Sequence, residues 1–155
     1  FRSDKCAAIA KLGAEPINYR EQDFAQVIAE HTDGQGVNVI LDIMGASYLN
    51  NNLKALAMDG HLVMLGFLGG GKAHDVDLLT ILAKRAVITG SLLRPRSKDE
   101  KAAIAEQLRE YVWPVLAAGR CLPIIDKVYE YTDAAQAHAR MEGGDHIGKI
   151  VLRVN

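Results

Sequence analysis

The chain has 155 residues, which is enough for one domain with a substantial hydrophobic core. Its hydrophobic content of 49% is that of an ordinary globular protein, and its net charge of −1 argues against a nucleic-acid or polyanion binder. No apolar run approaches the length of a membrane span. Cys6 and Cys121 lie far apart and in no CxxC motif, so we interpret both as reduced packing residues and expect a cytoplasmic protein.

The N-terminal part predicts two helices on either side of a short extended segment. Ser3 or Asp4 can cap a helix that runs to about Leu12 and ends at the following glycine. Residues 16–19 are a plausible minor strand, and residues 22–30 predict an amphipathic helix. Because the chain starts abruptly, with no methionine and no signal peptide, we expect it to be part of a longer protein.

Residues 36–44 are the stretch around which we expect the chain to be organised. They are nearly all apolar and rich in β-branched residues, which predicts a strand buried on both faces of a parallel sheet. The following elements are a helix at 48–57, a turn at Asp59-Gly60, a buried strand at 61–67, a helix at 76–84 and a buried strand at 86–91. Since strands alternate with helices, we predict an α/β fold with a parallel sheet and right-handed crossovers.

The last third of the chain changes character. Ser97 can cap a long helix that runs to about Ala118 and is interrupted or bent at Pro114. After it come a strand at 124–131, a short helix at 132–141 and an alternating strand at 149–154. We expect this tail to belong to a sheet other than the main one.

Three strand ends are the first candidate site. Parallel strands end at one edge of their sheet, where ligands of open α/β sheets bind. The candidate residues lie where the three predicted strands end and become loops, and are Met44, Gly45, Gly66, Phe67, Leu68, Ser91, Leu92 and Leu93. Glycine lets the backbone approach a flat ligand, and the apolar neighbours can form a slot for a ring. Ordinary βα turns would have the same composition, so that alternative stays open.

A second candidate site lies near the N-terminus. Arg2, Ser3, Lys5 and Tyr19 bring cations and hydroxyls to the start of a helix, a combination that suits a phosphate. A solvated surface is the alternative, and Asp4 leaves open the selection of a ribose 2′-hydroxyl. No nucleophile–base pair stands out, and the five histidines show no metal-ligand spacing. We therefore expect no metal site and assign no catalytic residue.

Several segments together resemble a known family. They are Ser-Asp-Lys-Cys (3–6), Lys-Leu-Gly-Ala (11–14), Ile-Asn-Tyr-Arg (17–20), Val-Ile-Leu-Asp-Ile-Met-Gly (39–45), Gly-Ser-Leu-Leu-Arg-Pro-Arg (90–96) and His-Ile-Gly-Lys-Ile-Val-Leu (146–152). Together they resemble the C-terminal half of zinc-independent medium-chain dehydrogenase/reductases. The branch they resemble is the NADPH-dependent quinone oxidoreductases related to zeta-crystallin and the p53-inducible quinone oxidoreductase.

The resemblance implies a cofactor and its contacts. Lys5 and Tyr19 match positions that contact the adenosine 2′-phosphate of NADPH, and Ser3 and Arg2 are neighbours of suitable chemistry. The positions near the ribose and nicotinamide match Gly45, Leu65, Gly66, Phe67, Leu68, Ser91, Leu92 and Leu93, beside Met44, with Arg94 a weaker candidate. The family's glycine-rich pyrophosphate turn would precede residue 1.

The resemblance also implies a division of the chain. Residues 1–120 would be part of a Rossmann-type NADP-binding domain, without its first two strands and glycine turn, and residues 121–155 would return to the catalytic domain. In the strand order 3-2-1-4-5-6, residues 16–19 would be the third strand, and 36–44, 61–67 and 86–91 the fourth, fifth and sixth. We expect this chain alone to be inactive.

The implied function is hydride transfer from NADPH to a quinone or related conjugated carbonyl, without zinc. An enoyl-thioester or alkene reductase of the same superfamily is an alternative, and a non-catalytic, crystallin-like NADPH-binding protein is another. Family members pair edge strands across a two-fold axis, so we expect a homodimer through residues 86–91.

Overall fold

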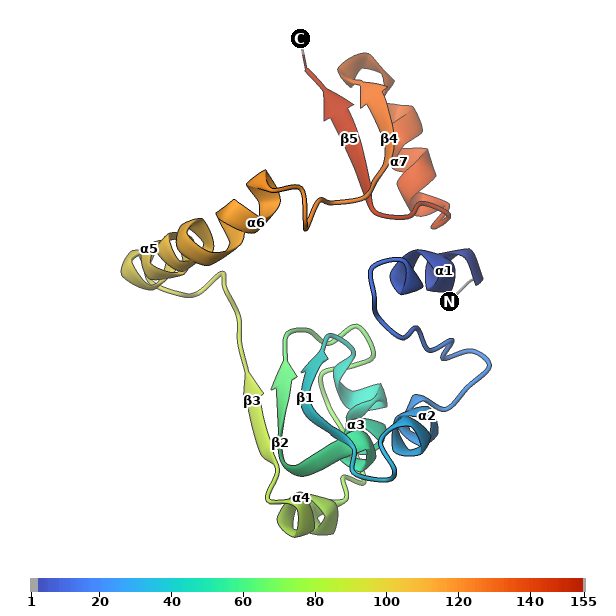
Figure 1. Cartoon of the computed structure of the whole chain (residues 1–155), viewed down its shortest axis with the longest axis vertical. Helices are drawn as coiled ribbons and strands as arrows, with labels where there is room; N and C mark the ends of the chain where they lie inside the picture. The colour runs from blue at the N-terminus through green and yellow to red at the C-terminus, as the bar shows by residue number, and fades with distance from the viewer. Residues whose placement is uncertain (1–2, 155) are drawn as a thin grey trace. The chain divides into compact units, whose positions relative to one another are not determined.

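In the computed structural model, which describes residues 3–154, helices and strands alternate along the chain (Figure 1). Contacts within the chain divide it into one unit up to Arg96 and a second unit from Ser97. Both units contain parallel strands and helices, which confirms the predicted α/β class. The boundary near residue 120 between cofactor-binding and catalytic parts stays a prediction.

Three parallel strands form the sheet of the first unit. They are β1 (Val37–Asp42), β2 (Leu56–Met64) and β3 (Val87–Gly90). Their spatial order is β1-β2-β3, and both neighbouring pairs are parallel. The three predicted strands are thus confirmed, in the succession expected for the fourth, fifth and sixth strands of a dinucleotide-binding sheet, although β2 covers residues 56–64 and not 61–67.

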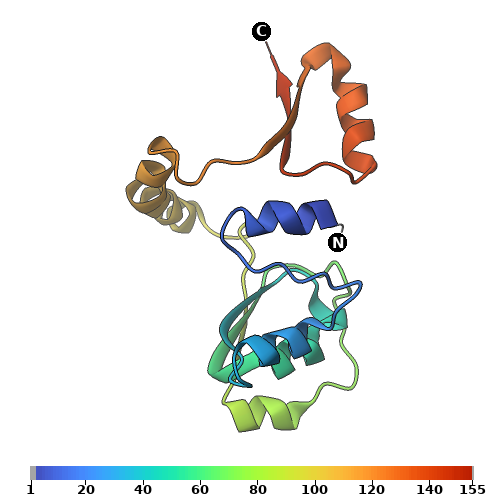
Figure 2. The same ribbon diagram turned by 45° about the vertical axis from the view of Figure 1, so that its right-hand side comes forward.

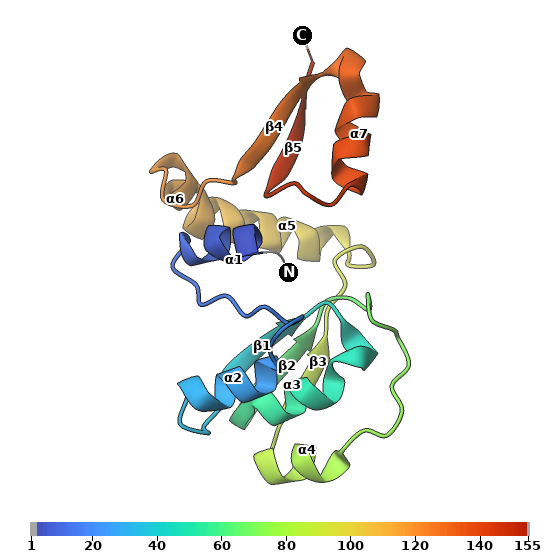
Figure 3. The same ribbon diagram turned by 90° about the vertical axis from the view of Figure 1, so that its right-hand side faces the viewer.

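Short helices precede β1 and connect the three strands. They are α1 (Ser3–Ala10), α2 (Phe24–His31), the 3₁₀ turn η1 (Gly45–Ser47), α3 (Leu49–Ala55) and α4 (Leu78–Lys84). The side chains of Asp23 and Asp77 accept hydrogen bonds from the first turns of α2 and α4, as expected of N-caps. Helices α2 and α3 lie side by side on one face of the sheet (Figures 2 and 3).

The core of the first unit lies between this helical layer and the sheet. Leu53 on α3 and Leu62 on β2 are fully buried there. The alternation of side chains along a strand puts Val39 and Leu41 on the opposite face, where they are 58% and 67% exposed. The prediction that this strand is buried on both faces is therefore wrong for the described chain, because helices cover it from one side only.

Two local predictions are also wrong. Residues 16–19 are not a strand, since no described segment pairs with them. The turn predicted at Asp59-Gly60 lies inside β2. Val37 pairs with Leu56 and Val39 with His61, so β2 carries extra residues at this point, and Asp59 takes the left-handed conformation with φ of 58°. In place of the predicted turn, the chain forms a bulge within one strand.

The second unit begins with a long, interrupted helix. It consists of α5 (Lys98–Gln107), the π-helical turn η2 (Leu108–Val112) and α6 (Trp113–Ala117). Ser97 and Glu100 form a reciprocal capping box at its start, as the sequence predicts. The irregular turn ends two residues before Pro114, whose missing N–H cannot donate to the preceding turn.

A small second sheet follows. It pairs β4 (Ile125–Glu130) with β5 (Lys149–Arg153) in parallel, and the connection contains the 3₁₀ turn η3 (Tyr131–Asp133) and α7 (Ala134–Glu142). The expectation that the tail forms a separate sheet is confirmed. Within residues 3–154, no helix combines the length and hydropathy that crossing a bilayer requires.

Candidate functional site

The carboxyl ends of β1, β2 and β3 meet at one edge of the sheet, as their parallel pairing requires. The backbone N–H of Leu65 donates to the carbonyl of Asp42 at 2.7 Å, and that of Ser91 donates to the carbonyl of Met64 at 3.0 Å. Hydrogen bonding between the strands therefore continues into the loops. The structure brings together the predicted strand-end residues in one continuous edge.

The loop after β2 is attached to the end of β1. The backbone N–H of Leu68 donates to the carbonyl of Ile43 at 3.0 Å, and that of Gly69 donates to the carbonyl of Met44 at 2.7 Å. In return, the N–H of Ala46 donates to the carbonyl of Gly70 at 2.9 Å. These reciprocal bonds hold the glycine-rich loop against the β1 turn, so the edge is ordered by the chain itself.

The close approach of the β2 loop to the turn after β1 requires a glycine at position 45. Its φ is +75°, and a Cβ at this position would lie 2.7 Å from the carbonyl oxygen of Gly70 and 3.1 Å from Phe67 Cδ1. The sequence predicts that glycine here makes room for a ligand. The contact with Gly70 is by itself sufficient to explain it.

Asp42 is a functional candidate that the sequence interpretation missed. Its carboxylate is buried and accepts hydrogen bonds from the backbone N–H of Met44 at 3.0 Å and of Gly45 at 2.7 Å. The one signal in the sequence is a charged residue at the end of a mostly apolar strand, where an unpaired carboxylate would be costly. Asp42 fixes the conformation of the turn that leaves β1.

Apolar side chains surround this fixed backbone. Phe67, Leu68, Leu92 and Leu93 are exposed, Leu68 by 78%. Ser91 is partly buried, and its Oγ accepts a hydrogen bond from Arg96 Nη2 at 3.1 Å. An ordered backbone edge with exposed apolar side chains can contact the face of a flat ring while its peptide groups bond polar substituents.

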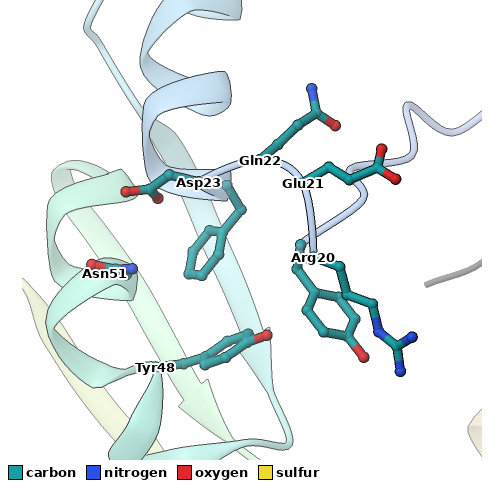
Figure 4. Close-up of a pocket in the computed structure, with 8 residues that line it drawn as sticks. Arg20, Glu21, Gln22, Asp23, Tyr48 and Asn51 are labelled. Carbon is teal, nitrogen blue, oxygen red and sulfur yellow. The ribbon is translucent and has the colours of Figure 1, made fainter.

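The second candidate site contains a pocket of about 370 Å³ (Figure 4). It lies between the segment before α2 and the start of α3. Its lining residues are Tyr19, Arg20, Glu21, Gln22, Asp23, Phe24, Tyr48 and Asn51. The rings of Phe24 and Tyr48 pack with centroids 5.1 Å apart and form an aromatic wall.

This pocket contains only part of the set of residues that the sequence predicts to bind a phosphate. Tyr19 lines it, whereas Lys5 lies on α1 and is not among the lining residues. The cation that lines it is Arg20, which the sequence interpretation did not single out, and Glu21 and Asp23 add carboxylates. Arg2 and the side chain of Ser3 lie outside the described part.

Comparison with known proteins identifies the family. The family model described as zinc-binding dehydrogenase matches residues 12–152. The chain belongs to this zinc-binding dehydrogenase family. Its relatives include quinone oxidoreductases, so the resemblance to medium-chain dehydrogenase/reductases of the quinone oxidoreductase type is confirmed.

Individual relatives match nearly the whole chain. The 2-haloacrylate reductase of a Burkholderia species is 32% identical over 155 residues, which cover 96% of this chain and 45% of that protein. The quinone oxidoreductase of Rattus norvegicus is 27% identical over 139 residues, which cover 89% and 40%. A crystal structure of 2-haloacrylate reductase aligns with a TM-score of 0.79 and 28% identity, covering 99% of this chain and 48% of that one. The chain therefore spans less than half the length of these relatives.

Membership of a zinc-binding dehydrogenase family raises the question of metal ligands. Among the described residues there is no group of three or more histidine, cysteine, aspartate or glutamate side chains that could hold a metal ion. Cys6 belongs to the first unit and Cys121 to the second. The donor set of this chain thus offers no zinc site within residues 3–154.

Proposed function

We propose that the protein containing this chain transfers hydride from NADPH to a quinone or a related conjugated carbonyl, and that this chain supplies the cofactor-binding edge. The observation that carries the proposal is the ordered strand-end edge, in which Asp42 and the β2 loop fix the backbone around Gly45. The quinone oxidoreductase relatives support the reaction class.

In this proposal the strand ends hold the nicotinamide half of the cofactor. Leu65, Gly66, Phe67 and Leu68 at the end of β2, and Ser91, Leu92 and Leu93 after β3, lie beside the ring and its ribose, with Met44 and Gly45 next to them. Their apolar side chains exclude water from the reacting carbon, and the fixed backbone orients the ring. NADPH supplies the hydride, and the protein supplies orientation and electrostatics.

The adenosine half is assigned to the N-terminal residues. Ser3 and Lys5 bind the 2′-phosphate, and Tyr19 donates to it from the pocket shown in Figure 4. The aromatic wall of Phe24 and Tyr48 offers a surface for the adenine ring. A cation near the phosphate favours NADPH over NADH, because charge-assisted hydrogen bonds to phosphate are the stronger kind.

A second function is favoured by one specific observation. The relative that is 32% identical is named for reduction of 2-haloacrylate, an alkene conjugated to a carboxylate. An alkene or enoyl-thioester reductase therefore stands as the alternative. The same edge would serve it, since these residues would contact the cofactor in either reaction.

The test is NADPH oxidation by the full-length protein with a panel of quinones, 2-haloacrylates and enoyl thioesters. Turnover of quinones in preference to alkenes supports the proposal, and the reverse order supports the alternative. Binding of NADPH without turnover of any of them indicates a non-catalytic, crystallin-like protein.

The variant Leu68→Asp places a charge on the apolar edge and should reduce turnover, whereas Leu79→Asp, at a similarly exposed leucine on α4, should not.

A further inference from the structure

Arg96 closes the loop that follows β3. Its backbone N–H donates to the carbonyl of Leu93 at 3.2 Å, and its guanidinium Nη2 donates to Ser91 Oγ at 3.1 Å. Ser91 is in turn held to β2 through its N–H and the carbonyl of Met64. Residues 91–96 thus form a closed turn that keeps Leu92 and Leu93 exposed at the sheet edge.

The direction of the bond between Arg96 and Ser91 is fixed by chemistry. A guanidinium has donors and no acceptor, so Ser91 Oγ must be the acceptor. The hydroxyl keeps its own proton as a donor. Within residues 3–154, Ser91 Oγ has no hydrogen-bond partner besides Arg96. The O–H of Ser91 is therefore left to donate to a group that this part of the chain does not provide.

The bond also changes how well Ser91 donates. A hydroxyl that accepts a bond from a cation is polarised, and its own O–H becomes a stronger donor. Since Ser91 is partly buried, water screens the interaction less than at an open surface. A group with a partly negative oxygen would gain most from such a donor.

We propose that Arg96 is a positioning residue, which orients and polarises Ser91 so that the Ser91 hydroxyl donates to a carbonyl oxygen bound at the strand-end edge. This inference rests on the proposed function. Two carbonyl oxygens have the required chemistry, that of the nicotinamide carboxamide and that of a conjugated carbonyl substrate. Both are planar acceptors, and the substrate oxygen also gains negative charge when hydride adds to the conjugated system.

The experiment is a double-mutant cycle in the full-length protein, with Ser91→Ala, Arg96→Ala and the double variant. We expect each single change to lower kcat/KM roughly tenfold, the size of one charge-assisted hydrogen bond, and the double variant to be no worse than either. Guanidinium ion added at millimolar concentration should restore part of the activity of Arg96→Ala and none of that of the double variant. Arg96→Lys should lie between wild type and Arg96→Ala.

The binding constant for NADPH without substrate separates the two carbonyl groups. A loss of affinity in that binary complex assigns the bond to the cofactor, whereas unchanged affinity with a lower kcat assigns it to the substrate. Additive effects of the two changes, or rescue that does not depend on Ser91, would overturn the inference. Arg109→Ala, which removes an exposed guanidinium paired with Glu106, is the matched control. If the wild-type protein does not oxidise NADPH with any substrate of the panel, the result contradicts the proposed function instead.

Discussion

The carboxylate of Asp42 accepts a hydrogen bond of 2.7 Å from the backbone N–H of Gly45, three residues later in the chain. With the second bond, from Met44, it directs the chain out of β1 in one fixed conformation. The carbonyl of Gly70 then lies close enough to Gly45 that no side chain fits between them. The geometry of the proposed cofactor edge thus depends on a buried acid and a glycine.

We predict that Gly45→Ala destabilises the protein and weakens cofactor binding. A Cβ would lie 2.7 Å from the carbonyl oxygen of Gly70, and the left-handed backbone adds strain of about 1–3 kcal/mol. Urea denaturation and NADPH titration of the full-length protein measure both effects. Gly13→Ala is the control, because Gly13 has φ of +85° and a Cβ added there would meet nothing within 4 Å. Equal losses in the two variants would show that the contact with Gly70 does not matter.

The second prediction concerns cofactor choice. Lys5→Ala should raise the KM for NADPH at least tenfold and leave that for NADH nearly unchanged, since a charge-assisted bond to phosphate contributes roughly 1.5–3 kcal/mol. Steady-state kinetics with both cofactors check it. Lys11→Ala, in the turn after α1, is the control for loss of a positive charge in the same region. A similar rise in both KM values would contradict the assignment of Lys5 to the 2′-phosphate.

The third prediction is that activity does not require zinc. The described residues of this chain offer no cluster of metal-ligating side chains, and the branch that it resembles works without the metal. Full-length protein treated with a strong chelator and then dialysed should keep its rate of NADPH oxidation, with no stoichiometric zinc by elemental analysis. One zinc per chain, together with loss of activity on its removal, would show that the prediction is wrong.

The fourth prediction is a homodimer through residues 86–91. In the sheet of the first unit, β3 is an end strand, paired with β2 on one side. An edge strand offers unpaired backbone groups that a second copy can pair with across a two-fold axis. Sedimentation of the full-length protein at micromolar concentration should give a dimer. A monomer over that range would rule out this mode of association.

Local sequence patterns determine several elements of the fold. The apolar runs at β1, β2 and β3 and the Ser97 capping box depend on local composition, and all could be predicted. The structure of residues 16–19 could not be predicted, because a segment of strand-like composition forms a strand only where another strand pairs with it. The Asp59-Gly60 pair predicts a turn, yet the left-handed backbone of Asp59 forms part of a bulge in β2.

The candidate site likewise has features that the sequence predicts and features that it does not. The strand-end residues converge because parallel strands must end together, which the alternation of elements already implies. The role of Asp42 and the contact of Arg96 with Ser91 depend on loop conformation, which sequence spacing does not determine. Arg20 was missed for the same reason, since only the folded segment before α2 puts it in the pocket with Tyr19.

The fifth prediction concerns acid stability of the second unit. Arg140 holds the carboxylate of Asp126 through Nε at 2.8 Å and Nη2 at 2.9 Å, and the N–H of Ile147 donates to it at 3.1 Å. These bonds, that of Arg140 first, lower the pKa of Asp126 from 3.8 to about 2. They join β4 to α7 and to the segment before β5.

Because the pKa is lower in the folded state, the bonds stabilise the fold fully above about pH 4 and lose their effect as the pH falls toward 2. Asp126→Asn should therefore unfold at lower urea concentration than wild type at pH 7, and the difference between them should shrink between pH 4 and pH 2. Glu130→Gln is the control, since its bond to Arg153 is more exposed and should matter less. A difference that stays constant down to pH 2 would show that the ionised carboxylate of Asp126 does not contribute to stability.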